Sequence, residues 1–138
     1  MSLERFEKAH EFAYEMALAE MKAGRKRSHW IWYIFPQIKG LGHSYNAQLY
    51  AITDLDEAQE FVAHPLLNAH LREITTTLLN HKGVDVDELM GSEIDAIKLC
   101  SSMTLFDIIS PNDIYRQVLD AFFDGVKCLR TCRMLDKD

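Results

Sequence analysis

The apolar positions of the chain recur with the spacing of amphipathic helices along most of its length. Residues 6–21 repeat an apolar position every three or four residues, in a segment that Ser2 can cap and Gly24 can end. The same spacing follows Pro65, which suits the first position of a helix, and continues until Gly83 stops it. Both patterns predict helices that bury one face.

Further helix starts are marked by residues that favour the N-cap position. Three of them carry an acidic residue three positions later: Asp54 with Glu57, Asp85 with Glu88, and Ser92 with Asp95. At a fourth, the order Ser110-Pro111-Asn112-Asp113 predicts a serine cap with the proline at the first helical position. The helix that follows carries apolar positions as far as Val126 and is expected to be the last one.

The remaining segments are less regular. Residues 30–35 are all apolar, so periodicity leaves open whether they form a short helix or a buried extended piece. Residues 37–44 contain two glycines and are expected to form a loop, while residues 48–53 carry one weakly alternating pattern. Capping and periodicity together predict a compact, single all-α domain over residues 1–138, a bundle of about six to eight helices.

The composition agrees with one soluble domain. A chain of 138 residues with 48% hydrophobic residues can bury a core without a metal or a disulfide. The side chains expected in one buried cluster are Trp32, Phe35, Leu71, Leu78, Met103, Phe106, Leu119 and Phe122.

The charge of the chain argues against some classes of partner. Fifteen Lys and Arg stand against 21 Asp and Glu, for a net charge of −6, and residues 43–71 contain no Lys or Arg. An acidic surface repels a nucleic-acid backbone, so no nucleic-acid partner is expected. The sequence begins without an apolar signal segment and holds no apolar run that could span a membrane, so we expect a cytoplasmic protein without a membrane partner.

The cysteines and histidines form no recognisable metal or disulfide pattern. Cys100, Cys128 and Cys132 are odd in number, which argues against a disulfide framework and for a reducing compartment. The six histidines lack the paired spacing of zinc ligands, so each is expected to be a surface or structural residue. No metal and no cofactor are predicted.

Residues 24–37, here called the basic–aromatic segment, combine three consecutive cations and a histidine with both tryptophans. In one interpretation the segment borders a pocket, in which a phosphate or carboxylate is contacted by Arg25, Arg27 or Lys26. Ser28 and His29 add hydrogen bonds there, and a tryptophan face stacks on a ring. In the other, the cations solvate a helix end and the aromatic residues fill the core, which is the commoner role of such residues.

A second polar group lies inside an apolar helix, at residues 98–104. Lys98 precedes Ser101 and Ser102 by three and four residues, so these side chains are neighbours on a helix. A lysine can activate a serine as a nucleophile, but the order here is the reverse of the Ser-x-x-Lys motif of penicillin-binding enzymes. Buried hydrogen bonds or the lining of a pocket are the better interpretation, and no catalytic residue is predicted.

Residues 25–37, followed by Gly40-Leu41-Gly42 and Tyr50-Ala51-Ile52, resemble the signature of domain-of-unknown-function family 1810, which consists of small, mostly bacterial proteins. Later blocks of the family are matched by His64-Pro65, by residues 98–106 and by residues 118–125. The resemblance implies a mainly helical fold and no particular reaction. One departure is Cys100, where relatives usually carry arginine, which removes a cation beside the two serines.

Two hypotheses of function follow, and they leave open whether the protein is an enzyme and how many copies assemble. The leading one is a domain that binds a small anionic or nucleotide-like ligand in a pocket between the basic–aromatic segment and residues 98–104. The alternative is a protein–protein interaction module without catalysis, with exposed apolar side chains. The predicted ligand-binding residues are Arg25, Arg27, Ser28, His29, Trp30, Lys98, Ser101 and Ser102.

Overall fold

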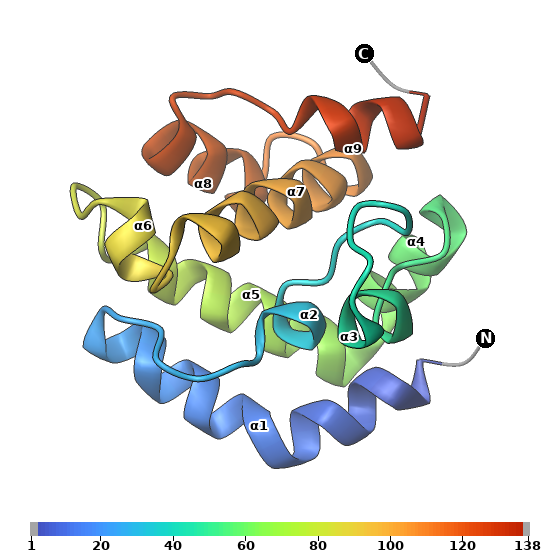
Figure 1. Cartoon of the computed structure of the whole chain (residues 1–138), viewed down its shortest axis with the longest axis horizontal. Helices are drawn as coiled ribbons and strands as arrows, with labels where there is room; N and C mark the ends of the chain where they lie inside the picture. Colours follow the sequence, from blue (N-terminus) through green and yellow to red (C-terminus); the bar gives the residue numbers. More distant parts are fainter. Residues whose placement is uncertain (1–2, 137–138) are drawn as a thin grey trace.

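The computed structural model describes residues 3–136, and their helices confirm the all-α prediction (Figure 1). The helices within this range are α1 (Glu4–Ala23), α2 (Ile31–Ile34), α3 (Tyr45–Leu49), α4 (Leu55–Ala63), α5 (Pro65–Leu79), α6 (Val86–Leu89), α7 (Glu93–Ile109), α8 (Ile114–Phe123) and α9 (Leu129–Met134). The β structure in the described part of the chain is a single parallel bridge between Ile38 and Ile52, so residues 48–53 form no strand.

The four longest helices build the body of the molecule. Figure 1 shows α5 crossing its middle, with α1 on one side and α7 and α8 on the other. The one-turn helix α2 packs against both α1 and α7, and α6 and α9 pack against α7. Since the basic–aromatic segment contains α2, it runs from the end of α1 toward α7.

Most of the expected core is buried. Phe35, Leu71, Leu78, Met103, Phe106 and Leu119 are each at most 1% exposed and belong to one cluster. Trp32 and Phe122 are only partly buried, which corrects the sequence prediction. A single helical turn cannot turn every side chain inward, and in α2 the buried positions are Ile31, Tyr33 and Ile34.

Several predicted helix starts are confirmed by their hydrogen bonds. The Asp54 carboxylate accepts the Glu57 N–H at 2.9 Å, and the Ser92 hydroxyl accepts the Asp95 N–H at 3.1 Å. Asp85 caps α6 in the same way. Pro65 is the first residue of α5, but that helix ends at Leu79, before Gly83. Ser2, the predicted cap of the first helix, lies outside the described residues.

The start of α8 differs from the prediction. Asp113, not Ser110, caps the helix, and its Oδ1 accepts the Ile114 N–H at 2.7 Å. Ser110 instead ends α7 and donates its hydroxyl proton to Asp113 Oδ2 at 2.8 Å. Asn112 has a φ of 58°, a left-handed conformation that excludes a right-handed helix at this point. The capping residue was misplaced because two residues of this turn can serve as caps.

The C-terminal part of the described chain also differs from the prediction. Helix α8 ends at Phe123, and Asp124 follows in a left-handed conformation, so Val126 is not helical. A further helix, α9, was not predicted. It has six residues and no side-chain cap, so it lacks the sequence signals of a helix start.

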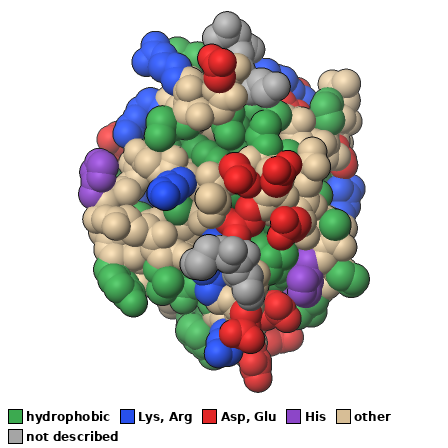
Figure 2. All heavy atoms as spheres, turned by 90° about the vertical axis from the view of Figure 1, so that its right-hand side faces the viewer, with side chains coloured by type: hydrophobic (Ala, Val, Ile, Leu, Met, Phe, Trp, Pro, Cys, Tyr) green, Lys and Arg blue, Asp and Glu red, His purple; other side chains and the backbone are tan. Residues whose placement is uncertain are grey.

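Charge is unevenly distributed over the surface. Figure 2 shows carboxylate side chains gathered on one face of the molecule, the side on which α4 lies in Figure 1. A shallow hollow there is lined by Thr53, Asp54, Asp56, Glu57 and Glu60. Two cations of the basic–aromatic segment, Lys26 and Arg27, lie elsewhere, beside α7.

Candidate functional site

The basic–aromatic segment is folded around one carboxylate. Helix α1 ends at Ala23, and the φ of 85° at Gly24 turns the chain back over Glu20. Glu20 Oε1 accepts the N–H groups of Arg27 and Ser28 at 2.8 and 3.0 Å and the Trp30 indole N–H at 2.8 Å. Glu20 Oε2 accepts the Ser28 hydroxyl at 2.5 Å. Burial opposes the negative charge, but these hydrogen bonds together lower the pKa of Glu20 to about 2.

The middle cation of the segment points inward. Lys26 is 6% exposed, and its ammonium lies 2.7 Å from Asp95 Oδ2 in the first turn of α7. The same ammonium donates to the Ser28 carbonyl and lies 4.9 Å from the Trp30 ring centroid. Gly91 packs closely against the backbone of Lys26, because a Cβ at this position would lie 2.6 Å from the Lys26 carbonyl oxygen. Lys26 therefore joins the segment to α7 and is not free for a ligand.

A hollow of about 350 Å³ opens beside this ion pair. The sequence prediction placed Arg27, Ser28 and His29 near Lys98, and all four line this hollow. Arg27 and His29 are exposed, and no hydrogen bond or ion pair of their side chains occurs within residues 3–136. The structure thus brings these predicted residues together.

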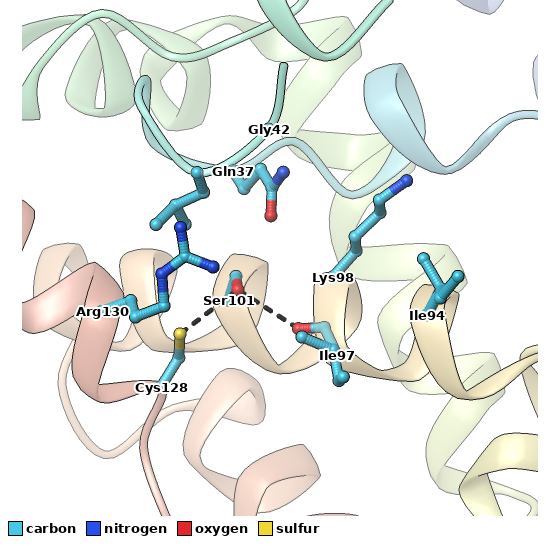
Figure 3. Close-up of a pocket in the computed structure, with 9 residues that line it drawn as sticks. Gln37, Gly42, Ile94, Ile97, Lys98, Ser101, Cys128 and Arg130 are labelled. Carbon is cyan, nitrogen blue, oxygen red and sulfur yellow. Dashed lines mark hydrogen bonds between the residues drawn. The ribbon is translucent and has the colours of Figure 1, made fainter. Parts of the chain in front are cut away.

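A second hollow, of about 200 Å³, lies further along α7 (Figure 3). Its lining residues are Gln37, Leu41, Gly42, Ile94, Ile97, Lys98, Ser101, Cys128 and Arg130. Lys98 and Ile94 line both hollows, so the two adjoin along one face of α7, and we call them together the α7 groove. In Figure 3 the Arg130 guanidinium extends toward the loop that carries Gln37.

Lys98 occupies the centre of the α7 groove. Its ammonium lies 5.3 Å from the Trp32 ring centroid, a cation–π distance, and 4.0 Å from Asp95 Oδ1. The Nε1 atom of Trp32 is buried and has no hydrogen-bond partner within residues 3–136. An indole nitrogen can only donate, so this N–H lacks an acceptor beside a cation.

Ser101 and Cys128 form the floor of the second hollow. Ser101 Oγ lies 3.2 Å from the Ile97 carbonyl oxygen and 3.3 Å from Cys128 Sγ. The Cys128 N–H donates to Thr104 at 2.9 Å, which fixes the start of α9 on α7. Burial opposes a charged thiolate, but hydrogen bonds from the Ser101 hydroxyl and from the backbone of Thr131 and Arg130 lower the pKa of Cys128.

Three predicted site residues lie outside the groove. Arg25 is exposed and lines neither hollow, and Trp30 is fully buried with its N–H bound to Glu20. Ser102 is also fully buried, roughly 100° around the helix from Ser101, and its hydroxyl has no hydrogen-bond partner in residues 3–136. Neighbouring positions on a helix thus point to different surroundings.

Other lining residues were not among those predicted. Ile94 and Ile97 are 65% and 57% exposed and form an apolar wall of the groove. Gln37 is the last residue of the basic–aromatic segment but was not among the predicted ligand-binding residues, and Arg130 comes from a segment without a sequence signal for a site. Within residues 3–136 no group of three or more His, Cys, Asp or Glu side chains could hold a metal ion. None of the helices in that range is long and apolar enough to cross a membrane.

Comparison with known proteins adds a family and a solved structure. The family described as "Protein of unknown function (DUF1810)" matches residues 1–135. The chain is also similar to the conserved hypothetical protein Rv1873 from Mycobacterium tuberculosis, known from its crystal structure, with a TM-score of 0.93 and 39% sequence identity. That match covers 99% of this chain and 97% of the other. No curated protein matches the sequence. Neither description names an activity.

Proposed function

The chain belongs to the DUF1810 family, whose description assigns no activity, and we propose from the geometry of the α7 groove that the protein binds a small organic anion there. The anionic group of the ligand, a phosphate or a carboxylate, contacts Lys98 and Arg27. Its apolar or planar body lies along α7 against Ile94 and Ile97. A nucleotide or an aromatic carboxylate has this combination of parts.

The balance of charge in the groove supports an anion. Asp95 is the only acidic side chain lining either hollow within residues 3–136, and Lys26 already pairs with it at 2.7 Å. The remaining cations in the groove are Arg27, Lys98 and Arg130. A concentration of positive charge in a protein with a net charge of −6 attracts anions locally.

The Trp32 indole N–H is the observation that carries the proposal. It is a buried donor without an acceptor in the described residues, and it belongs to a side chain that lines the groove beside Lys98. Leaving such a donor unpaired costs about 1–3 kcal/mol. Because the Nε1 atom itself is buried, an oxygen atom of an anionic ligand would supply the missing acceptor once the Trp32 ring turns toward the groove, where it would also face the Lys98 charge. The unpaired Trp32 N–H and the charge of Lys98 therefore both favour a ligand with an anionic oxygen.

The lining of the second hollow suits a ligand that has an apolar part and a second polar or charged end. Leu41, Ile94 and Ile97 offer apolar contacts, while the Gln37 amide can both donate and accept hydrogen bonds. Arg130 stands at the far end from Arg27 and can pair with a second anionic group. A mostly apolar lining with a few polar groups is typical of small-molecule sites.

A thermal-shift screen against nucleotides, sugar phosphates and aromatic or dicarboxylic acids tests the proposal. A ligand at a hundred times its dissociation constant stabilises the folded protein by about 2.7 kcal/mol, which raises Tm measurably. Lys98→Met should remove the rise in Tm. Lys22→Met, which removes the same charge from an exposed position in the last turn of α1, should retain it. Equal responses of both variants would contradict a site at Lys98.

A second candidate function is a protein-interaction surface centred on the same groove. Its support is the exposure of Ile94, Ile97 and Leu129, three large apolar side chains in or next to the lining. The two functions respond differently to mutation. Ile97→Ala should weaken either one, whereas loss of the Lys98 charge is decisive only for an anion.

A further inference from the structure

A separate hollow of about 400 Å³ lies between α1 and α5. Its lining residues are Glu7, His10, Glu11, Tyr14, Glu15, Leu66 and His70, and none of them lines the α7 groove. Two histidines from different helices meet in it, with His10 Nδ1 2.9 Å from His70 Nδ1. Two ring nitrogens at this distance share one proton, so one of them donates and the other accepts.

A backbone carbonyl group determines which of the two histidines donates the hydrogen bond between them. His10 Nε2 lies 2.8 Å from the Tyr33 carbonyl oxygen, which can only accept, so the proton of neutral His10 is on Nε2. His10 Nδ1 is then the acceptor, and His70 must donate from Nδ1. The proton of neutral His70 is therefore on Nδ1, and its Nε2 carries a lone pair. That Nε2 makes no hydrogen bond or ion pair within residues 3–136.

Neighbouring groups hold the His70 ring in place. The Tyr14 ring stacks on it, with centroids 3.6 Å apart and planes 2° from parallel. Tyr14 is fixed in turn, because its hydroxyl donates to Glu73 Oε1 at 2.5 Å. Burial lowers the pKa of His10 to about 4 and also lowers the pKa of His70, although Glu73 and Glu15 oppose the second shift. Both rings are therefore neutral at pH 7.

We propose that this hollow is a second functional site, in which His70 Nε2 accepts a hydrogen bond from a small protonated amine. The histidine pair carries the proposal, and the surrounding charges only select the ligand. Those charges are carboxylates from both helices, Glu7, Glu11 and Glu15 on α1 and Glu73 on α5, and no Lys or Arg is among the lining residues. His64, which caps α5, pairs with Glu7 at 3.6 Å. A cation or a neutral donor suits these surroundings, and an anion does not.

Nitrogen-15 NMR of the imidazole rings of the whole protein at neutral pH tests the tautomers directly. The expected result is a proton on Nε2 of His10 and on Nδ1 of His70. A neutral His70 with its proton on Nε2 would overturn the proposal, since no lone pair would then be available there.

Two matched variants test the role of His10 as the residue that positions His70. The Gln side chain of His10→Gln can still donate to Tyr33 but has no acceptor where Nδ1 was, so the His70 proton should redistribute toward Nε2. The shorter Asn of His10→Asn retains an acceptor near Nδ1 and should preserve the Nδ1–H form of His70. The same redistribution in both variants would contradict a positioning role. If a variant does not fold, the wild-type spectrum still decides the tautomer.

Three small probes, added in turn while the His70 signals are followed, test the ligand class. Propylamine, which is protonated at neutral pH and bears N–H donors, should shift the His70 Nε2 signal saturably. Tetramethylammonium, a cation without N–H, and propionate, an anion, should not. An equal shift with tetramethylammonium would show that the carboxylates alone hold the cation, and no saturable shift with propylamine would reject an amine. Either outcome would overturn the proposal.

Discussion

The Lys26 ammonium lies 2.7 Å from the Asp95 carboxylate, and this pair joins the loop after α1 to the first turn of α7. The contact explains how an Arg-Lys-Arg run can stand directly before a buried aromatic block. The middle cation is internal, while the cations on either side of it remain exposed. One of these, Arg27, thereby lines the α7 groove, and Lys98 lies one helical turn beyond Asp95.

Breaking the buried ion pair should destabilise the protein. Lys26→Ala leaves the partly exposed Asp95 carboxylate with only Lys98, at 4.0 Å, and should lower the free energy of unfolding by about 1–3 kcal/mol. Arg25→Ala, at an exposed neighbouring position, should change it by less than about 0.5 kcal/mol. Urea unfolding of both variants measures the difference. A loss below about 1 kcal/mol for Lys26→Ala would mean that the pair does not hold the segment on α7.

Glu20 should make the loop sensitive to acid. Its pKa is lowered from 4.5 to about 2 because the gain from its hydrogen bonds exceeds the cost of burial. A carboxyl group with a lowered pKa stabilises the fold above its unfolded value, and this contribution disappears as the pH falls from about 4.5 to about 2. Glu20→Gln should therefore be less stable than the wild type at pH 7, and the gap in Tm should narrow over that range. A constant gap would contradict the shift.

Burial of His10 should make the stability of the fold depend on pH over a higher range than Glu20 does. Burial lowers its pKa from 6.5 to about 4, so between these values the unfolded chain binds a proton that the folded chain does not. The free energy of unfolding should then fall by up to about 3 kcal/mol as the pH drops from 6.5 to 4. Unfolding of wild type and His10→Gln across this range measures the effect, and the variant should show the flatter dependence. His43→Gln, at an exposed position, is the control and should follow the wild type.

The helices could largely be predicted from the sequence because their signals are local. Asp54 and Ser92 bond to backbone N–H groups three residues away, so their positions alone identify a helix start. The signal fails where two residues compete, as Ser110 and Asp113 do, and where a short helix such as α9 depends on packing.

The site could be predicted only in part, for a related reason. Arg27, Ser28 and Lys98 could be predicted because they are charged or hydroxyl residues within apolar stretches of the sequence, and the fold brings them together. Sequence spacing does not reveal that Lys26 turns inward to Asp95, because the two residues are far apart in the chain. The pairing of His10 with His70 joins different helices, so each appeared in the sequence as an isolated histidine.

The two tryptophans provide the most direct test of the α7 groove, because their indole N–H groups have different surroundings. Trp30 donates to Glu20, whereas Trp32 has no acceptor within residues 3–136. Each indole N–H gives its own signal in a proton–nitrogen correlation spectrum. Adding the anion with the largest thermal shift should move the Trp32 signal in the wild type and leave Trp30 nearly unchanged, and Lys98→Met should abolish the movement. A ligand that stabilises the protein while the Trp32 signal stays in place would contradict binding in the α7 groove.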